Sequence, residues 1–376
     1  MLKLRVPLPV FRNATEIVNG TNSRMALKGL VSNKVVLIIS QSFNDSKYFD
    51  QVRRLINTQA LKVVTKSWIG EPSRNDLLPL IQELEAFQPD YIVALGGGSV
   101  IDGAKVGWLF YEHPTLEDDI LFRPFSLPPL RGRAKFAAIP TTIGTGGEVS
   151  SAAVVFDDVS KRKRAVVTHD FLPDLVILDP ELVTDVPASL LKPTIADALS
   201  HAVEGYVSNI KHPLMTSLAE KAVEIIARYS GAIGEEAWSL DMISDLQHAA
   251  MLAGWVQNHC VVGLSHAIAH QLGPYKIGHG AANGKLMPSV IEYNSGDNLV
   301  SQEYKKLCAR ANLNDVAELK LLFARLCEDV HVPLKLREED LAIISSGAME
   351  DPAAKTNPRA FTELDVREIV LDVFGK

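Results

Sequence analysis

The sequence predicts two domains: an α/β domain over residues 1–184 and an all-α domain over residues 185–376. Three observations predict this fold class. In the first half, short apolar runs rich in β-branched residues alternate with helical periodicity, which is typical of βαβ units around a buried parallel sheet. In the second half, long segments carry apolar residues at i, i+3, i+4 and i+7. The length of 376 residues also suits about two domains.

The apolar runs and the helical periods place the individual elements along the chain. Strands are expected at Val35–Ser40, Leu61–Lys66, Tyr91–Gly96, Phe136–Thr141 and Asp174–Asp179. Helices are expected at Tyr48–Leu55, Leu77–Phe87, Leu214–Ile226, Asp241–Val256 and Val316–Val330. Because Pro180 and Pro187 bracket the change of period, we place the domain boundary near residue 185.

Composition and charge exclude several classes of protein. Apolar residues make up 47% and charged residues 22%, as in a well-packed globular protein. The net charge of −7 counts against a nucleic-acid or membrane partner, and no apolar run approaches the roughly 20 residues that span a bilayer. The start of the chain does not resemble a signal peptide, and the three cysteines are widely spaced, so we expect a cytoplasmic protein without disulfides.

A glycine-rich loop follows the strand expected at Tyr91–Gly96. The glycines Gly96, Gly97 and Gly98 precede a helix start, at which Ser99 suits the N-cap and Asp102 the acid of a capping box. Glycine allows an anion such as pyrophosphate to approach the positive end of the helix. The spacing matches neither GxGxxG nor the Walker pattern, so a plain tight turn is the alternative.

A second loop, Ile139–Glu148, follows another apolar strand and offers the hydroxyls of Thr141, Thr142 and Thr145. Alone, it could also be a plain loop. In open α/β sheets, however, ligands bind at the carboxyl ends of the strands, where both loops would lie. Together the loops predict a nucleotide site in the first domain.

The helical half brings together the residue types that bind transition metals. It contains Asp197 with His201 and His266 with His270, both at i, i+4, and then His279. One carboxylate with two or three imidazoles suits Zn²⁺ or Fe²⁺. Any one of these histidines alone would more often be a capping or core residue, but their grouping favours a metal site. His259, two helical turns before His266, is a weaker candidate for the same pocket.

These blocks resemble the iron-containing (group III, metal-dependent) alcohol dehydrogenases. The matching segments are Gly96–Asp102, Pro140–Glu148, Asp197–Glu204, Gly263–His270 and His279–Asn283, in the order and at about the spacing of the family. The similarity runs from about residue 10 to residue 295, and beyond residue 300 only the helical character matches.

The resemblance implies a dinucleotide-binding α/β domain and a helical metal-binding domain, the dehydroquinate-synthase-like architecture. It implies hydride transfer between NAD or NADP and a metal-bound alcohol or aldehyde. The implied ligands of one Fe²⁺ or Zn²⁺ ion are Asp197, His201, His266 and His279. The implied cofactor-binding residues are Gly97, Gly98, Ser99, Asp102, Thr141, Thr142, Thr145 and Lys163.

One implied role, that of Lys163, and one role predicted from the helical spacing, that of His270, have an alternative. Lys163 lies where the family places a lysine near the cofactor, but its segment Lys161–Arg164 could equally be a solvated basic turn. His270, one turn past His266, is expected to face the same cleft and to relay a proton. Its alternative is a packing or supporting role beside the metal ligands.

Some positions depart from the family pattern. Gly147 replaces a usual serine, and Glu71-Pro72-Ser73 stands where Asn-Pro-Thr is common, which puts a nucleotide contact in doubt. The first strand ends in Ser40 and Gln41, where many relatives carry an aspartate that repels a 2′-phosphate. Lys47 follows, but so does Asp45, and no arginine is placed to grip the phosphate. We therefore expect use of both cofactors with a slight preference for NADP(H).

Two rival functions share parts of this pattern. One is a 3-dehydroquinate-synthase-like lyase, although Lys276 and Lys285 are the only cations around His266–His279. The other is a non-catalytic nucleotide-binding relative, which should not retain a complete ligand set. A homodimer or larger homo-oligomer is also expected, because the apolar segment Leu2–Phe11 could add an edge strand across a two-fold axis.

Overall fold

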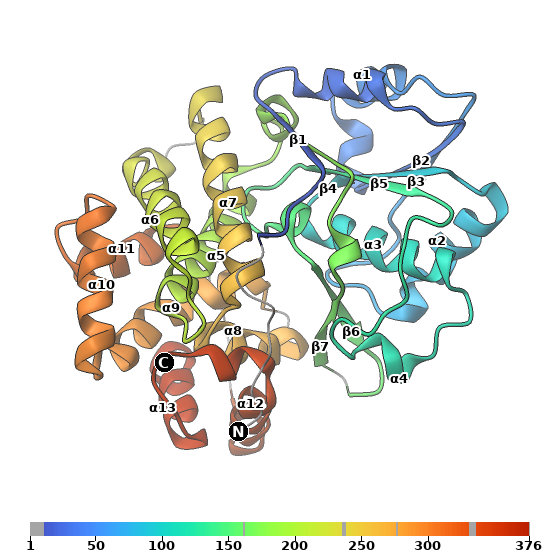
Figure 1. Ribbon diagram of the computed structural model, residues 1–376. Helices are drawn as coiled ribbons and strands as arrows, with labels where there is room; N and C mark the ends of the chain where they lie inside the picture. Colours follow the sequence, from blue (N-terminus) through green and yellow to red (C-terminus); the bar gives the residue numbers. More distant parts are fainter. Residues whose placement is uncertain (1–10, 161, 235–237, 276, 331–335, 376) are drawn as a thin grey trace.

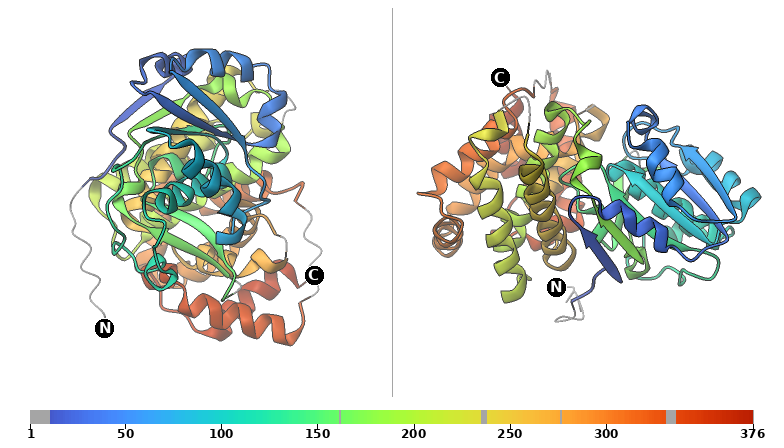
Figure 2. Two further views of the ribbon diagram at one scale, coloured as in Figure 1. Left: turned by 90° about the vertical axis from the view of Figure 1, so that its right-hand side faces the viewer. Right: turned by 90° about the horizontal axis from the view of Figure 1, so that it is seen from above.

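The computed structural model describes residues 11–160, 162–234, 238–275, 277–330 and 336–375. Figures 1 and 2 show two lobes side by side, one built around a β-sheet and one built from helices. The predicted fold class, an α/β domain followed by an all-α domain, is confirmed. The boundary that we place after residue 184 falls between the 3₁₀ helix η5 (Pro180–Val183) and the helix α5 (Ala188–Val207).

The sheet lobe contains a six-stranded parallel sheet in the order β1-β8-β5-β4-β2-β3. Its strands are β1 (Glu16–Asn19), β2 (Lys34–Ile39), β3 (Ala60–Thr65), β4 (Tyr91–Gly96), β5 (Lys135–Pro140) and β8 (Leu175–Leu178). Every residue of the central strand β4 is buried, which explains its continuous apolar run. In the register, Ile39 pairs with both Thr65 and Leu95, so β2, β3 and β4 end at the same edge.

Helices cover both faces of this sheet (Figure 1). Val36 and Ile38 of β2 pack toward α2 (Arg74–Phe87) and α3 (Gly98–Glu112). The alternate residues Val35 and Leu37 pack toward α1 (Phe49–Leu55) and the 3₁₀ helix η1 (Ser23–Gly29). Side chains of a strand alternate between its faces, so a strand covered on both sides is apolar throughout. This lobe also contains α4 (Asp118–Leu121) and further short 3₁₀ helices.

All five predicted strands overlap strands of the structure, with ends that agree to within one residue. The prediction missed β1 and the antiparallel hairpin of β6 (Ala152–Asp157) and β7 (Arg162–Val167). β7 begins with Arg-Lys-Arg and its side chains are mostly half-buried or exposed, so its sequence resembles a charged turn. Only its pairing with β6 makes it a strand.

The helical lobe contains no strand among its described residues, in agreement with the prediction. Its helices are α5, α6 (Pro213–Arg228), α7 (Leu240–Cys260), α8 (Leu264–Ala269), α9 (His279–Ser295), α10 (Asn298–Arg310), α11 (Val316–Leu326), α12 (Glu338–Glu350) and α13 (Glu363–Phe374). α5 lies in the centre and packs against α6, α7 and α9, and it is fully buried from Ile195 to Val207. None of the described helices has the length and apolar character needed to span a membrane.

Candidate metal and nucleotide site

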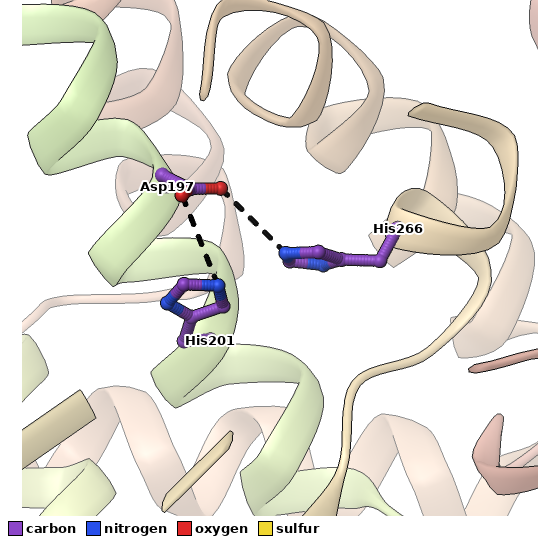
Figure 3. Close-up of side chains that lie close together, drawn as sticks. All are labelled: Asp197, His201 and His266. Carbon is purple, nitrogen blue, oxygen red and sulfur yellow. Dashed lines mark ion pairs between the residues drawn. The ribbon is translucent and has the colours of Figure 1, made fainter. Parts of the chain in front are cut away.

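The side chains of Asp197, His201 and His266 converge inside the helical lobe (Figure 3). One ligand atom from each lies within 4.8 Å of the other two, and all three side chains are buried. Asp197 Oδ2 is 3.8 Å from His201 Nε2, and Asp197 Oδ1 is 3.6 Å from His266 Nε2. The first two residues share one face of α5, whereas His266 comes from α8. The i, i+4 spacing of Asp197 and His201 therefore places these two side chains as the sequence predicts.

His279, the first residue of α9, lies beside this cluster. Its Nε2 is 3.7 Å from Asp197 Oδ1, but it lies outside the mutual group of three and remains 22% exposed. Gly280 permits the approach of α9 to α5, because a Cβ there would meet the carbonyl oxygen of Pro193 at 2.3 Å. The structure thus brings all four predicted ligands together, with His279 on the exposed side.

Glu204 and Asn283 hold the cluster in place, and sequence reasoning gave neither of them a role. Glu204 Oε2 accepts a hydrogen bond from His266 Nδ1 at 2.6 Å, which leaves Nε2 facing Asp197. Asn283 Nδ2 donates to Asp197 Oδ1 at 2.9 Å and lies 3.2 Å from His279 Nε2. A signal for both was available, because Glu204 lies two helical turns after Asp197 and Asn283 is at i+4 from His279.

Burial and neighbouring charges perturb the ionisation of the cluster. Burial alone would raise the pKa of Asp197, but the imidazoles around it hold that pKa well below its usual range. Burial lowers the pKa of His201 to about 4. Burial acts in the same direction on His266, but the carboxylates of Glu204 and Asp197 outweigh it and raise its pKa to about 9. The cluster thus contains ionised carboxylate within a buried imidazole shell.

The donor set fits a divalent metal ion. Buried nitrogens usually have hydrogen-bond partners, but His266 Nε2 has none and faces Asp197. The nitrogen–oxygen separations of 3.6–3.8 Å are too long for hydrogen bonds. They are close to the ~3.4 Å between two ligand atoms that share a tetrahedral ion with bonds of about 2.1 Å.

His270 is the second residue of the i, i+4 pair on this side of the site. Its ring stacks on His279, with centroids 5.3 Å apart, and its Nδ1 donates to Asp351 Oδ2 at 2.9 Å. His270 therefore faces the cluster, as expected. Asp351 follows the end of α12, 81 residues further along the chain, and no local pattern pointed to it.

The first glycine loop differs from the prediction at its cap. Helix α3 begins at Gly98 with Gly97 as the N-cap, so the interpretation of Ser99 as N-cap and Asp102 as capping-box acid is wrong. The reason is that Ser99 is bonded elsewhere: its hydroxyl donates to the carbonyl of Gly70 and accepts from Lys66 Nζ at 3.0 Å and from Trp68 Nε1 at 3.1 Å. Groups of the loop after β3 therefore use the hydrogen-bonding capacity of this hydroxyl, which is not available to cap the helix.

The two nucleotide loops predicted from the sequence pack directly against each other. A Cβ on Gly97 would lie 3.1 Å from Thr142 Cγ2, and one on Gly98 would lie 2.7 Å from Thr145 Cγ2. A side chain at Gly98 would therefore clash with Thr145, and one at Gly97 would be tight against Thr142. Thr141, at the start of the second loop, is buried, and its backbone N–H donates to Gly96 O at 3.0 Å.

The second loop also touches the helix that carries the metal ligands. A Cβ at Gly144 would lie 1.9 Å from the carbonyl oxygen of Thr194, three residues before Asp197 on α5. Gly146, with φ of 61°, packs in the same way against Gly254 of α7. These contacts place the predicted nucleotide site next to the imidazole cluster.

Lys105 and Asp102 fasten the end of this second loop and the following strand β6 to α3. The fully buried Lys105 Nζ donates to the carbonyl oxygens of Gly147 at 2.6 Å and Ser150 at 2.8 Å. Asp102 Oδ2 accepts from the backbone N–H of Val154 at 3.0 Å. Burial raises the pKa of Asp102 to about 6 and lowers that of Lys105 to about 8. Asp102 thus links α3 to β6, the strand that follows the second loop.

Lys163 lies on β7 and is only 7% exposed, so the alternative of a solvated basic turn is wrong. Its Nζ forms an ion pair with Glu71 Oε1 at 2.7 Å. Its side chain also packs on Gly273 of the 3₁₀ helix η7 (His270–Tyr275), and it contributes to lowering the pKa of His279. Lys163 therefore lies between the two lobes near the imidazole cluster, and Glu71 is its partner.

His259 does not belong to this site. Its Nε2 accepts from the backbone N–H of Arg12, its Nδ1 bonds Trp255 O, and its ring stacks on Phe11. The expectation that it lines the metal pocket is thus wrong, because α7 turns this side chain toward the N-terminal segment. Apart from Phe11, the proposed dimer segment Leu2–Phe11 lies outside the described residues.

Comparisons with known proteins agree with this geometry. Residues 14–180 match the family model of the iron-containing alcohol dehydrogenases, and residues 193–374 match the model of their C-terminal domain. The NADPH-dependent butanol dehydrogenase of Clostridium saccharobutylicum is 31% identical over 94% of this chain and 95% of its own. The 1-propanol dehydrogenase PduQ of Salmonella typhimurium is 28% identical over 96% of this chain and 98% of its own.

Solved structures show the same fold. The iron-containing alcohol dehydrogenase of Thermococcus thioreducens superimposes with a TM-score of 0.87 and 25% identity, covering 97% of this chain and 100% of that one. A 1,3-propanediol oxidoreductase superimposes with a TM-score of 0.86 and 26% identity, covering 97% and 99%. The chain therefore belongs to the iron-containing alcohol dehydrogenase family and is an oxidoreductase, a metal-dependent alcohol dehydrogenase.

Proposed function

We propose that the protein transfers hydride between a nicotinamide cofactor and a short aliphatic alcohol or aldehyde, and that it prefers NADP(H) but also accepts NAD(H). The observation that carries the proposal is the contact of the second nucleotide loop with α5, through Gly144 and Thr194, beside the ligand Asp197. This contact sets the proposed nucleotide site beside the proposed metal site. The named relatives, which act on butanol and 1-propanol, support the class of substrate.

In this proposal Asp197, His201, His266 and His279 hold one Fe²⁺ or Zn²⁺ ion, between which the donor set does not choose. Such an ion supplies Lewis acidity toward the oxygen of the substrate. Glu204 fixes the ring of His266, and Asn283 fixes the carboxylate of Asp197, so that the ligands are oriented in advance.

The nucleotide loops orient the cofactor toward the same point. The backbone of Gly97 and Gly98 at the start of α3 offers N–H donors for pyrophosphate. The hydroxyls of Thr142 and Thr145 flank these glycines from the second loop. We propose that the buried Thr141 and the partly buried Asp102 support this arrangement, and that the Lys163–Glu71 pair borders the cofactor between the lobes.

His270 is the proposed proton relay. Because its Nδ1 hydrogen is donated to Asp351, its Nε2 is the nitrogen that can accept a proton from the alcohol or return one to the aldehyde. Its stacking on His279 keeps it at the exposed side of the cluster. A His270→Ala variant with an unchanged turnover rate would rule this role out.

The function can be tested with a panel of C2–C6 aldehydes and NADPH or NADH, using protein stripped of metal and then reloaded with Fe²⁺ or Zn²⁺. We expect oxidation of the cofactor that depends on both aldehyde and metal. Consumption of a sugar-phosphate substrate without net cofactor oxidation would instead favour the 3-dehydroquinate-synthase-like lyase. Cofactor binding with no turnover of any substrate would favour the non-catalytic relative.

We further propose a cytoplasmic homodimer or larger homo-oligomer with no nucleic-acid or membrane partner. All three cysteines, Cys260, Cys308 and Cys327, are buried and unpaired, which suits a reducing compartment. The strand β1 lies at an edge of the sheet, where a second copy could add a strand. Light scattering that gives the mass of a monomer at micromolar concentration would contradict the oligomer.

A further inference from the structure

Lys66 is placed by the sheet at the edge where the nucleotide loops begin. Its backbone N–H donates to Ile39 O at 2.9 Å, which sets it beside Ser40, the residue that follows β2. Its Nζ reaches Ser99 Oγ, at 3.0 Å, in the first turn of α3. Since β2 lies between β3 and β4 in the sheet, this side chain passes over the end of β2.

The ammonium group of Lys66 has no counter-charge. Among the described residues it forms no ion pair, and the nearby carboxylate of Glu71 is already bonded to Lys163. The ammonium has three hydrogens to donate, and Ser99 Oγ accepts only one of them. Burial lowers the pKa of Lys66, and the charge of Glu71 offsets this only in part. The ammonium also lies over the ring of Trp68, 5.9 Å from its centroid, but neither this ring nor Ser99 provides a counter-charge. A partly buried cation without a counter-charge is costly, unless a ligand provides the anion.

The strand end beside the backbone of Lys66 carries neutral polar side chains. Ser40 Oγ and Ser42 Oγ lie 3.0 Å apart, and Asn44 Nδ2 donates to Thr65 Oγ1 at 3.1 Å. In a dinucleotide-binding sheet, the strand end next to the glycine loop binds the adenosine ribose, and an acid there excludes a 2′-phosphate. Here that strand end belongs to β2. It is followed by the hydroxyls of Ser40 and Ser42 instead of an acid, and the side chain of Lys66 passes over it.

We infer that Lys66 binds the 2′-phosphate of NADP(H) and is the residue that sets the cofactor preference. Ser40 and Ser42 would donate their hydroxyls to the same group. The sequence drew attention to Lys47 as the cation near this strand end, but Lys47 Nζ pairs with Asp185 at 3.2 Å. Lys66 was overlooked because it follows the next strand, and only the sheet brings it to β2. The inference rests on the proposed function, since it presumes a dinucleotide in this cleft.

The test compares NADPH with NADH, which differ only in the 2′-phosphate, by fluorescence titration of metal-free protein. The variants are Lys66→Met and Lys66→Arg, with Lys47→Met as the control. We expect Lys66→Met to weaken NADPH binding by about tenfold or more, equivalent to about 1.4 kcal/mol, and to leave NADH binding within about twofold. Lys66→Arg, which keeps the charge, should retain most of the preference, and Lys47→Met should match the wild type.

The other possible results contradict either the inference about Lys66 or the proposed function. An equal loss for both cofactors in Lys66→Met would place Lys66 on the pyrophosphate or in a structural role, and it would overturn the inference. So would unchanged binding of NADPH, or tighter binding of NADH than of NADPH by the wild type. Failure of the folded wild-type protein to bind either cofactor would contradict the proposed function itself. Thermal melts of each variant establish that it is folded.

Discussion

Glu204 and His266 form the shortest contact of the imidazole cluster with its surroundings, with Oε2 2.6 Å from Nδ1. Both side chains are almost completely buried. Glu204 Oε1 also accepts from the backbone N–H of Ser265 at 2.7 Å, so the carboxylate cannot turn away. This pair fixes the ring of His266 and leaves its Nε2 free to face Asp197.

The first prediction is that Glu204→Gln weakens metal binding by about 10- to 100-fold, since residues that orient metal ligands typically contribute that much. The substitution keeps the size of the side chain but removes the charge that favours an Nδ1–H donor. Chelator competition with Zn²⁺ measures the affinity. Glu292→Gln on the surface is the control and should bind metal normally. An unchanged affinity in Glu204→Gln would show that the pair is not needed to orient His266.

The second prediction concerns Asp351, which holds His270. Asp351→Asn should lower kcat by about ten- to a hundredfold, because general acid–base catalysis depends on an oriented imidazole. KM and metal content should change little. Asparagine preserves the bond from the Ala353 N–H to this side chain, so local structure is retained. Glu350→Gln, at an exposed neighbouring residue, is the control. A fall in metal content equal to the fall in kcat would mean that Asp351 supports the metal site instead.

The third prediction concerns the approach of α9 to α5. In Gly280→Ala the added Cβ meets Pro193 O and must push the two helices apart, which moves His279 away from Asp197. We expect loss of bound metal and a decrease of about 1–3 kcal/mol in the free energy of unfolding. Gly278→Ala is the matched control, because its Cβ enters open space; it should cost under about 1 kcal/mol as an N-cap change. Equal metal content in both variants would be the contrary result.

The fourth prediction separates the two halves of the site. Lys105→Met removes the ammonium that binds the carbonyls of Gly147, Ser150 and Ala152, and it leaves buried carboxylates without a cation. We expect a loss of roughly 3–5 kcal/mol in stability and weak nucleotide binding, but normal metal content. Denaturant unfolding and NADPH titration measure these effects, with the surface variant Lys306→Met as control. Normal nucleotide binding by Lys105→Met would show that Lys105 is not needed to hold the second nucleotide loop in place.

Local patterns were sufficient for five of the six strands of the main sheet and for much of the imidazole cluster. A strand buried on both faces, such as β4, is recognisable from its own residues, and so is an i, i+4 pair such as Asp197 and His201. The hairpin strand β7 was missed because its charged residues are half-covered only after it pairs with β6. Its partner β6 is adjacent in sequence, but part of its cover comes from η7, which lies far along the chain.

The rest of the site depends on distant contacts in the same way. Ser99 has the composition of an N-cap, but the loop after β3 takes its hydroxyl through Gly70 and Trp68. Asp351 reaches His270 from the far end of the chain. Lys163 could be read as a solvated lysine until the fold buries it against Glu71. The residue types predicted a metal site and a nucleotide site. Which side chains are free to bind a ligand depends on their hydrogen-bond and ion-pair partners in the folded protein.

The proposed chemistry requires one divalent ion bound by Asp197, His201, His266 and His279. Elemental analysis of wild type and of His266→Ala, each loaded with Fe²⁺ or Zn²⁺ and desalted, tests it, with His248→Ala as a control outside the cluster. We expect about one metal ion per chain in the wild type and in the control, and little or none in His266→Ala together with loss of aldehyde reduction. Equal metal content in His266→Ala and the wild type would contradict it.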